Sequence, residues 1–156
     1  ADTPKDFFSR GVGHFKEYGD VTTIKLPCSP DGLWACKKLS DINIRVNITL
    51  VFSVSQAILA ALAGASYISP FVGRMDDNSL SGLGLVHDIA KVYKEQSVQT
   101  KILAASIRDV QSVGKAFELG ADICTVPPEV FDKMYNHVLT DKGLKQFNED
   151  ANSTTA

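Results

Sequence analysis

The sequence predicts an α/β protein built on a parallel β-sheet, and three features carry this prediction. Strand-like and helix-like segments alternate from Val21 onward, an alternation typical of βαβ units. The phrases Ala63-Gly64-Ala65 and Leu119-Gly120-Ala121 each end a predicted helix and lead directly into a strand, which indicates a repeated unit. The length of 156 residues, with 44% hydrophobic and 22% charged residues, suits one globular domain.

The elements follow one another with recognisable boundary signals. An opening helix fits residues 4–18, and the β-branched run at about 21–26 indicates a strand. Ser53 and Asp109 are plausible N-caps, and Gly64 and Gly120 are plausible C-terminal stops. Further strands are expected at about 44–50, 66–71, 100–105 and 121–126, and helices at about 30–40, 53–63, 79–96, 109–118, 128–136 and 140–149. The residues from about 148 to 156 are expected to form a flexible tail.

Two parallel architectures fit this order, and the polar residues favour one of them. A doubly wound sheet usually carries a Gly-rich phosphate loop after its first strand, and the sequence has none. A (β/α)8 barrel places its site at the carboxyl ends of its strands, with side chains pointing inward. Polar residues recur on one face of successive predicted strands. On the strand expected at about 44–50, Val46, Ile48 and Leu50 make the opposite, apolar face. The fold class expected is therefore α/β, of the (β/α)8-barrel type.

The chain is short for a closed barrel. A barrel of about 250 residues uses about 31 residues per βα unit, and this sequence supplies about five units. Residues 1–156 are therefore expected to form one partial barrel domain. Open sheet edges and an uncovered inner face would favour association with other chains.

Lys25 is the first candidate for chemistry. It lies in a strand-like run and is expected to face away from Ile24 and Leu26. If it were buried, the neutral amine would be favoured, and a neutral lysine attacks carbonyl carbon to form a Schiff base. The alternative is a lysine at a strand end whose ammonium reaches solvent.

Composition excludes several classes of function. The net charge of −2 gives no support for binding nucleic acid or an anionic membrane. No apolar run is long enough to span a bilayer, and no signal-peptide pattern is present. The scattered cysteines and histidines show no metal-ligand spacing. Neither a metal nor another cofactor is expected, and reduced cysteines favour a cytoplasmic protein. The cysteines are Cys28, Cys36 and Cys124, and the histidines are His14, His87 and His137.

Six motifs, taken together, resemble the small bacterial-type transaldolases over nearly the whole chain. They occur in the family's order and with family-like spacing, although each motif alone is weak. They are Thr23-Ile24-Lys25-Leu26-Pro27, Val46-Asn47-Ile48-Thr49-Leu50, Ser69-Pro70-Phe71-Val72-Gly73-Arg74, Ala104-Ala105-Ser106-Ile107-Arg108, Thr125-Val126-Pro127-Pro128 and Leu139-Thr140-Asp141-Lys142-Gly143-Leu144.

The resemblance implies an eight-fold βα barrel with the Schiff-base lysine on its fourth strand. Lys25 matches that lysine, so the chain resembles strands four to eight. In the family the first three strands carry an aspartate, an asparagine in a Thr-Thr-Asn-Pro motif and a catalytic glutamate. None of these has a counterpart in the sequence, so an N-terminally incomplete transaldolase is expected.

The resemblance also implies a reaction and a set of site residues. A Schiff base would transfer a dihydroxyacetone unit between sugar phosphates of the pentose phosphate pathway. Asn47 would hydrogen-bond the bound intermediate, and Thr49 would hold a proton-shuttling water. Ser69 and Phe71 would line the pocket. Substrate phosphate would bind to Arg74, Ser106 and Arg108, and Asp76 or Asp77 could pair with Arg74.

Two other functions stay open at this stage. Fructose-6-phosphate aldolases share the lysine chemistry, but they usually carry Tyr at the position of Phe71 and lack the Asn of Val46-Asn47. A catalytically inactive partial barrel that still binds sugar phosphate is the second alternative. Members of the family often form rings of subunits, so a homo-oligomer is expected, with segment 140–149 as a candidate contact.

Overall fold

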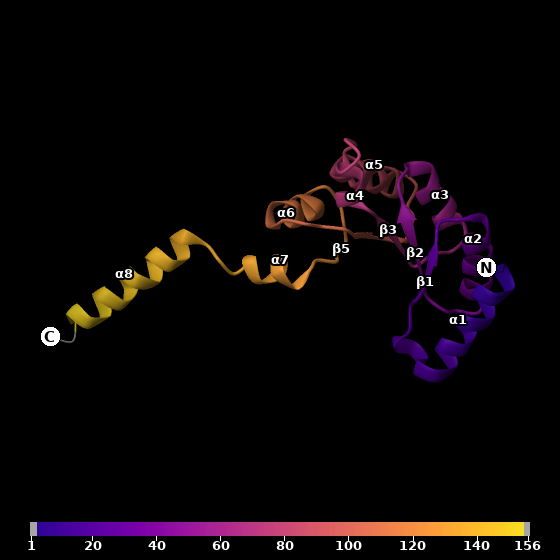
Figure 1. Ribbon diagram of the computed structural model, residues 1–156, viewed down its shortest axis with the longest axis horizontal. Coiled ribbons are helices and arrows are strands. Elements are labelled where there is room, and N and C mark those ends of the chain that lie inside the picture. The colour runs from indigo at the N-terminus through magenta and orange to yellow at the C-terminus, as the bar shows by residue number, and fades with distance from the viewer. Residues whose placement is uncertain (1–2, 155–156) are drawn as a thin grey trace.

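A five-stranded parallel sheet forms the centre of the molecule, and its strands pair in chain order. A computed structural model describes residues 3–154. Figure 1 shows the strands side by side, with helices crossing between them. This arrangement confirms the expected parallel α/β fold and corresponds to part of a (β/α)8 barrel. The strands are β1 (Ile24–Pro27), β2 (Val46–Val51), β3 (Tyr67–Pro70), β4 (Lys101–Ala104) and β5 (Ile123–Cys124).

Helices connect each strand to the next. Most predicted helices form close to their expected bounds, and Ser53 and Asp109 cap their helices by accepting hydrogen bonds from the amides of Gln56 and Ser112. The helices are α1 (Pro4–Tyr18), α2 (Pro30–Ser40), α3 (Val54–Leu62), α4 (Val72–Asp76), α5 (Gly82–Glu95), α6 (Val110–Glu118), α7 (Pro128–Lys133) and α8 (Val138–Thr154), with a 3-10 turn η1 (Gly19–Val21) after α1.

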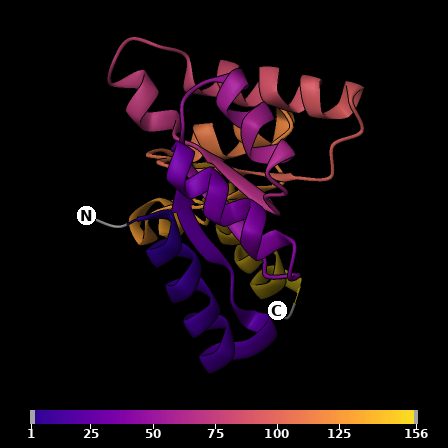
Figure 2. The same cartoon turned by 90° about the vertical axis from the view of Figure 1, so that its right-hand side faces the viewer.

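One face of the sheet carries the hydrophobic core. Ile48 and Ile68 on neighbouring strands are fully buried, and they pack with buried helix residues such as Leu39, Ala57 and Ile89. Figure 2 shows helices stacked along this side of the sheet. Burial of these apolar side chains is the main source of stability for such a layer.

The other face of the sheet is open and carries the polar residues. Strand register places Lys25 beside Asn47, Asn47 beside Tyr67, and Tyr67 beside Lys101. Because residues in register share a face, these four side chains form one row, which we call the inner row. Lys25 and Lys101 are exposed, whereas Asn47 and Tyr67 are half-buried. The inner row is the surface that would line the interior of a closed barrel.

Two local features differ from the sequence expectation. Leu50 was expected on the apolar face, but it has φ of 60° and lies at a register shift between Ile48 and Val51. Val51 is the buried residue instead. The short helix α4 was not expected, because the phrase Phe71 to Arg74 has no helical periodicity long enough to reveal it.

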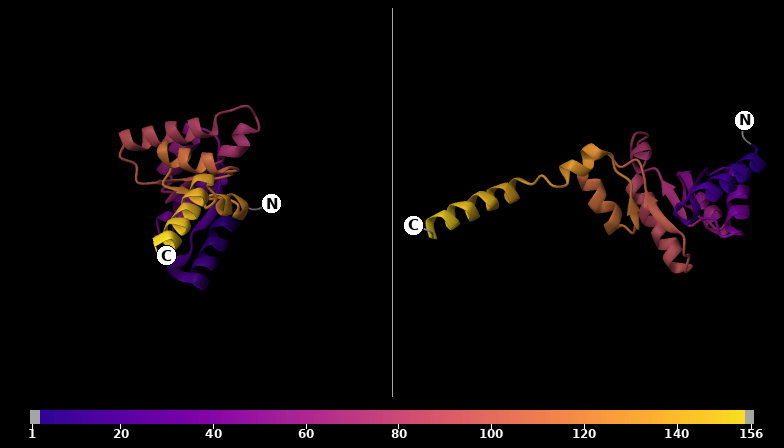
Figure 3. Two further views of the ribbon diagram at one scale, coloured as in Figure 1. Left: turned by 90° about the vertical axis from the view of Figure 1, so that its left-hand side faces the viewer. Right: turned by 90° about the horizontal axis from the view of Figure 1, so that it is seen from below.

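The last two helices leave the sheet. Figure 1 and the right-hand view of Figure 3 show α8 projecting away from the other elements, and no residue from 138 to 153 is buried. Residues 148–154, expected to form part of a flexible tail, are the final turns of α8; residues 155 and 156 lie outside the described part. A run with neither proline nor β-branched residues from 143 to 152 lets the helix continue. Within residues 3–154, no helix is long and apolar enough to cross a membrane.

Candidate active site

Lys25 lies on the inner face of β1, the first strand of the sheet. Its strand neighbours Ile24 and Leu26 are buried on the opposite face, so the predicted alternation is confirmed. Of the two alternatives that the sequence leaves open, the described structure has the second, because Lys25 is exposed. The physical reason is that no described strand covers the inner face beyond β1.

A hydrogen bond links two of the predicted site residues on neighbouring strands. Ser69 is 1% exposed, and its hydroxyl donates to Oδ1 of Asn47 over 2.9 Å. This bond fixes the Asn47 amide, because one acceptor position is occupied and the NH2 group is left to face elsewhere. Since Asn47 is the register partner of Lys25, the bond holds an oriented amide beside the lysine.

Thr49 follows Asn47 on the same face of β2, as the alternation predicts. Its Oγ1 is buried and has no hydrogen-bond partner among residues 3–154. A buried hydroxyl without a partner is costly. An unpaired hydroxyl on the inner face is suited to a water or to a polar group of a ligand.

Phe71 and Arg74 meet where β3 leads into α4. The Arg74 guanidinium lies 5.1 Å from the centre of the Phe71 ring, within range of a cation–π contact. The ring of Phe52 meets Phe71 edge-on, at 5.8 Å between centroids. Phe52 was not predicted as a site residue, and only the bend after β2 brings it to this position. The three side chains form a continuous wall at the carboxyl ends of β2 and β3.

Ser106 and Arg108 lie in the loop that follows β4. The strand expected at about 100–105 is β4, which ends at Ala104, and Ser106 has φ of 60°. Both residues reach the start of α4, because the Gly73 amide donates to the Ser106 carbonyl over 3.1 Å. A cavity of about 200 Å³ is lined by these residues and by aspartates of α4 and its C-cap.

The acidic partner of the arginines differs from the sequence expectation. Asp77 binds Arg108 through both carboxylate oxygens, whereas the carboxylate of Asp76 accepts from the Gly82 amide over 3.0 Å. The side-chain hydrogen bond from Arg108 holds the pKa of Asp77 below its usual value. The expected pairing of either aspartate with Arg74 is therefore not seen, because Arg74 turns toward Phe71.

Cys28 lies just beyond the strand that carries Lys25. Its thiol is half-buried and contacts the Gln56 carbonyl over 3.9 Å. Burial raises the pKa of Cys28, and burial raises the pKa of Cys36 to about 12. Thiols in this state react slowly, because the thiolate is the nucleophile. Among residues 3–154, no group of three or more His, Cys, Asp or Glu side chains is placed to hold a metal ion.

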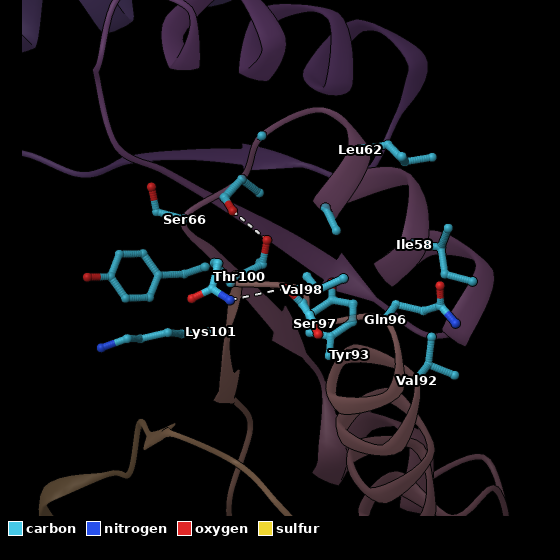
Figure 4. Close-up of a pocket in the computed structure, with 15 residues that line it drawn as sticks. Ile58, Leu62, Ser66, Val92, Tyr93, Gln96, Ser97, Val98, Thr100 and Lys101 are labelled. Atoms are coloured by element: carbon cyan, nitrogen blue, oxygen red, sulfur yellow. Dashed lines mark hydrogen bonds between the residues drawn. The ribbon is translucent and has the colours of Figure 1, made fainter.

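A second hollow, of about 1060 Å³, lies away from these residues. Figure 4 shows it between α3 and α5, with Ile58 and Leu62 on one side and Lys101 on the other. It opens at the amino ends of β3 and β4. In barrel enzymes this end of the strands serves stability, whereas chemistry occurs at the carboxyl ends. We therefore assign the candidate site to the inner face and the carboxyl ends of β2 to β4.

Comparison with known proteins agrees with this assignment. The family model described as Transaldolase/Fructose-6-phosphate aldolase matches residues 4–156. A probable transaldolase from Roseobacter denitrificans is 54% identical over 138 residues, covering 88% of this chain and 64% of the relative. One from Paracoccus denitrificans is 52% identical over 137 residues, with coverages of 88% and 63%. The chain thus spans less than two thirds of the length of these relatives.

A solved structure supports the fold alone. A variant of GMP reductase from Trypanosoma brucei, in complex with guanosine 5'-monophosphate, superposes with a TM-score of 0.59 at 17% sequence identity. The match covers 78% of this chain and 28% of the reductase. The parallel sheet, the retained motifs and the match over residues 4–156 lead to one conclusion. The chain belongs to the transaldolase/fructose-6-phosphate aldolase family.

Proposed function

We propose that the protein acts as a transaldolase of the pentose phosphate pathway in the cytoplasm. The reaction would transfer a dihydroxyacetone unit from sedoheptulose 7-phosphate to glyceraldehyde 3-phosphate, giving erythrose 4-phosphate and fructose 6-phosphate. The observation that carries the proposal is the register of β1 and β2, which sets Lys25 beside Asn47 on one inner face. The hydrogen bond from Ser69 then orients the Asn47 amide.

Lys25 would supply the nucleophile. Its Nζ attacks the C2 carbonyl of the ketose, and loss of water from the resulting carbinolamine gives an iminium. A base removes the proton of the C4 hydroxyl, the C3–C4 bond breaks, and its electron pair moves into the iminium to give an enamine. The aldehyde product leaves. The enamine carbon then attacks the acceptor aldehyde, the new alkoxide takes a proton, and water releases the product ketose.

The neighbouring polar residues would position the intermediate. Asn47 can donate from its NH2 group to a hydroxyl of the lysine-bound chain, because Ser69 already binds its carbonyl oxygen. The unpaired Oγ1 of Thr49 can hold the water that moves protons. Phe71, supported by Phe52, would cover the bound carbons.

The substrate phosphate would bind at the carboxyl ends of β3 and β4. Arg74 and Arg108 supply guanidinium groups that suit phosphate oxygens, and Ser106 supplies a hydroxyl beside them. Supporting this, the three residues follow adjacent strands, and two of them line one cavity. A phosphate held here would hold the sugar over the inner face, where Lys25 lies.

Two rival functions belong to the same site. The family includes fructose-6-phosphate aldolases, but Phe71 and Asn47 favour transaldolase, as the motifs indicate. The other rival is an inactive partial barrel that still binds sugar phosphate. It is considered because the chain covers only 64% of the length of a relative. Comparing the rate of transfer from a ketose phosphate with the rate at which free dihydroxyacetone adds to glyceraldehyde 3-phosphate separates transaldolase from fructose-6-phosphate aldolase.

Trapping the iminium tests the proposed function directly. Incubation with dihydroxyacetone followed by borohydride reduction is expected to leave a stable adduct on Lys25, because borohydride converts the iminium to a secondary amine. Peptide mapping by mass spectrometry locates the adduct. The 156-residue chain alone is expected to form this adduct but to turn over slowly, since the family's glutamate has no counterpart in it. Placement of the adduct on another lysine would contradict the assignment.

We further infer that the protein is a homo-oligomer whose contacts include α8. The helix exposes Val138, Leu139, Leu144 and Phe147, and exposed apolar residues grouped on one element mark association surfaces. The variant Phe147→Asp is expected to lower the mass measured by light scattering after size exclusion. Leu80→Asp, also at an exposed apolar position but outside α8, is the matched control and should leave the mass unchanged. A monomeric wild-type protein would refute the inference.

A further inference from the structure

We propose that Asp77 is an internal anion that competes with substrate phosphate for Arg108. Asp77 would thereby set the affinity of the site for phosphate. This inference rests on the proposed function, in which Arg108 is a phosphate contact. It adds Asp77 to the site. The sequence offered Asp77 as a partner of Arg74, whereas the structure pairs it with Arg108.

The contact between the two side chains uses the whole end of the guanidinium. Nη1 of Arg108 donates to Oδ1 of Asp77, and Nη2 donates to Oδ2 over 2.6 Å. Two parallel N–H···O bonds of this kind are the arrangement that Arg also forms with phosphate. The Asp77 carboxylate therefore occupies the edge of Arg108 that a phosphate would use.

The other edge of Arg108 is turned toward the protein. A Cβ atom built on Gly73 would lie 2.9 Å from Nε of Arg108 and 2.2 Å from the Ser106 carbonyl oxygen. The Nε edge thus faces the backbone of α4 and is not open to a second bidentate anion. A phosphate that binds Arg108 through a full fork must displace Asp77.

The surroundings make such an exchange feasible. The side chains of Arg108 and Asp77 are 55% and 48% exposed, and exposed ion pairs contribute little to stability. The charge of Arg74 also helps to lower the pKa of Asp77, so the carboxylate lies within the field of both arginines. A phosphate dianion brings more charge and a third oxygen to the same place. It can replace the carboxylate, and the apparent affinity for phosphate is then the intrinsic affinity multiplied by the fraction of time that Arg108 is free.

Inorganic phosphate is the probe, because it isolates the anion contact from the sugar. Its dissociation constant would be measured by calorimetry at pH 8 for the wild-type chain and for five variants. Asp77→Asn is expected to bind phosphate about three- to five-fold more tightly, since the competing anion is lost. Arg108→Met is expected to bind it about tenfold more weakly, and adding Asp77→Asn to Arg108→Met should give no further gain.

Asp76→Asn is the matched control. It removes the same charge from the neighbouring position, and the Asn carbonyl can still accept the hydrogen bond from the Gly82 amide. Its effect on phosphate binding should be smaller than that of Asp77→Asn. A general effect of charge would instead make the two variants equal, and that result would overturn the proposal.

Two further results would also overturn it. Unchanged or weaker phosphate binding in Asp77→Asn would mean that Asp77 only braces Arg108, and Asp77→Ser would check that result with a shorter side chain. A persistent gain from Asp77→Asn in the Arg108→Met background would mean that Arg108 is not the shared partner. Failure of the proposed function is distinguishable, because dihydroxyacetone carries no phosphate. Its borohydride adduct on Lys25 reports that function independently.

Discussion

Replacing Lys25 by Met is expected to abolish the borohydride-trapped adduct and to lower transaldolase kcat by at least about 1,000-fold, measured in a version that spans the whole length of the transaldolase relatives. The methionine side chain has no amine nitrogen to condense with the ketose carbonyl, so no iminium forms and the C3–C4 bond has no electron sink. Substrate phosphate should still bind, because the arginines of the rim lie on other elements. The measurements are intact-protein mass spectrometry and a coupled assay of product aldehyde.

Lys101→Met is the matched control for this experiment. Lys101 lies on the same inner row as Lys25 and is likewise exposed, so the substitution removes an identical charge from the same face of the sheet. It should leave the adduct in place and change kcat by less than about tenfold. If Lys25→Met kept most of the activity, or if the adduct moved to Lys101, the Schiff-base assignment would fail.

Gly73→Ala is expected to destabilise the chain by about 1–3 kcal/mol and to weaken phosphate binding by about tenfold or more. The added methyl group would lie 2.2 Å from the Ser106 carbonyl oxygen. That oxygen belongs to backbone and accepts the Gly73 amide hydrogen bond, so relief requires the loop after β4 to move. The movement would carry Ser106 and Arg108 away from Arg74. Urea unfolding and phosphate calorimetry measure the two effects.

Gly114→Ala provides the control, since a Cβ on this glycine of α6 meets nothing within 4 Å. Because alanine is the better helix former, this variant should gain about 0.5–1 kcal/mol of stability with phosphate binding unchanged. A Gly73→Ala variant that unfolds at the wild-type urea concentration and binds phosphate normally would show that the close approach of α4 to the loop is unimportant.

Local sequence signals predicted the elements well where they were strong. The helix expected at about 30–40 is α2 (Pro30–Ser40), and the structure shows that Ser29 caps it by accepting a hydrogen bond from the Gly32 amide. The alternation of Lys25 with Ile24 and Leu26 also predicted which face each residue takes. These features depend on neighbours in the chain, which the sequence shows directly.

Other features of the site depended on residues far apart in the chain. Ser106 adopts a left-handed conformation, which is uncommon for a residue other than glycine, so no local signal indicates the turn that brings Ser106 to the start of α4. Asp77 pairs with Arg108 and not with Arg74 because the loop after β4 meets α4 in space. Phe52 became part of the aromatic wall only through the bend that follows β2.

The sequence by itself determined the order of strands and helices, the family and the residue types of the candidate chemistry, since these follow from local spacing and motif identity. The tertiary structure alone decided which side chains meet and how exposed they are. Lys25 is exposed because burial depends on the covering of the sheet's inner face, and Arg108 is paired because two loops converge. Contact and solvent access are properties of distance in space, which spacing along a chain does not fix.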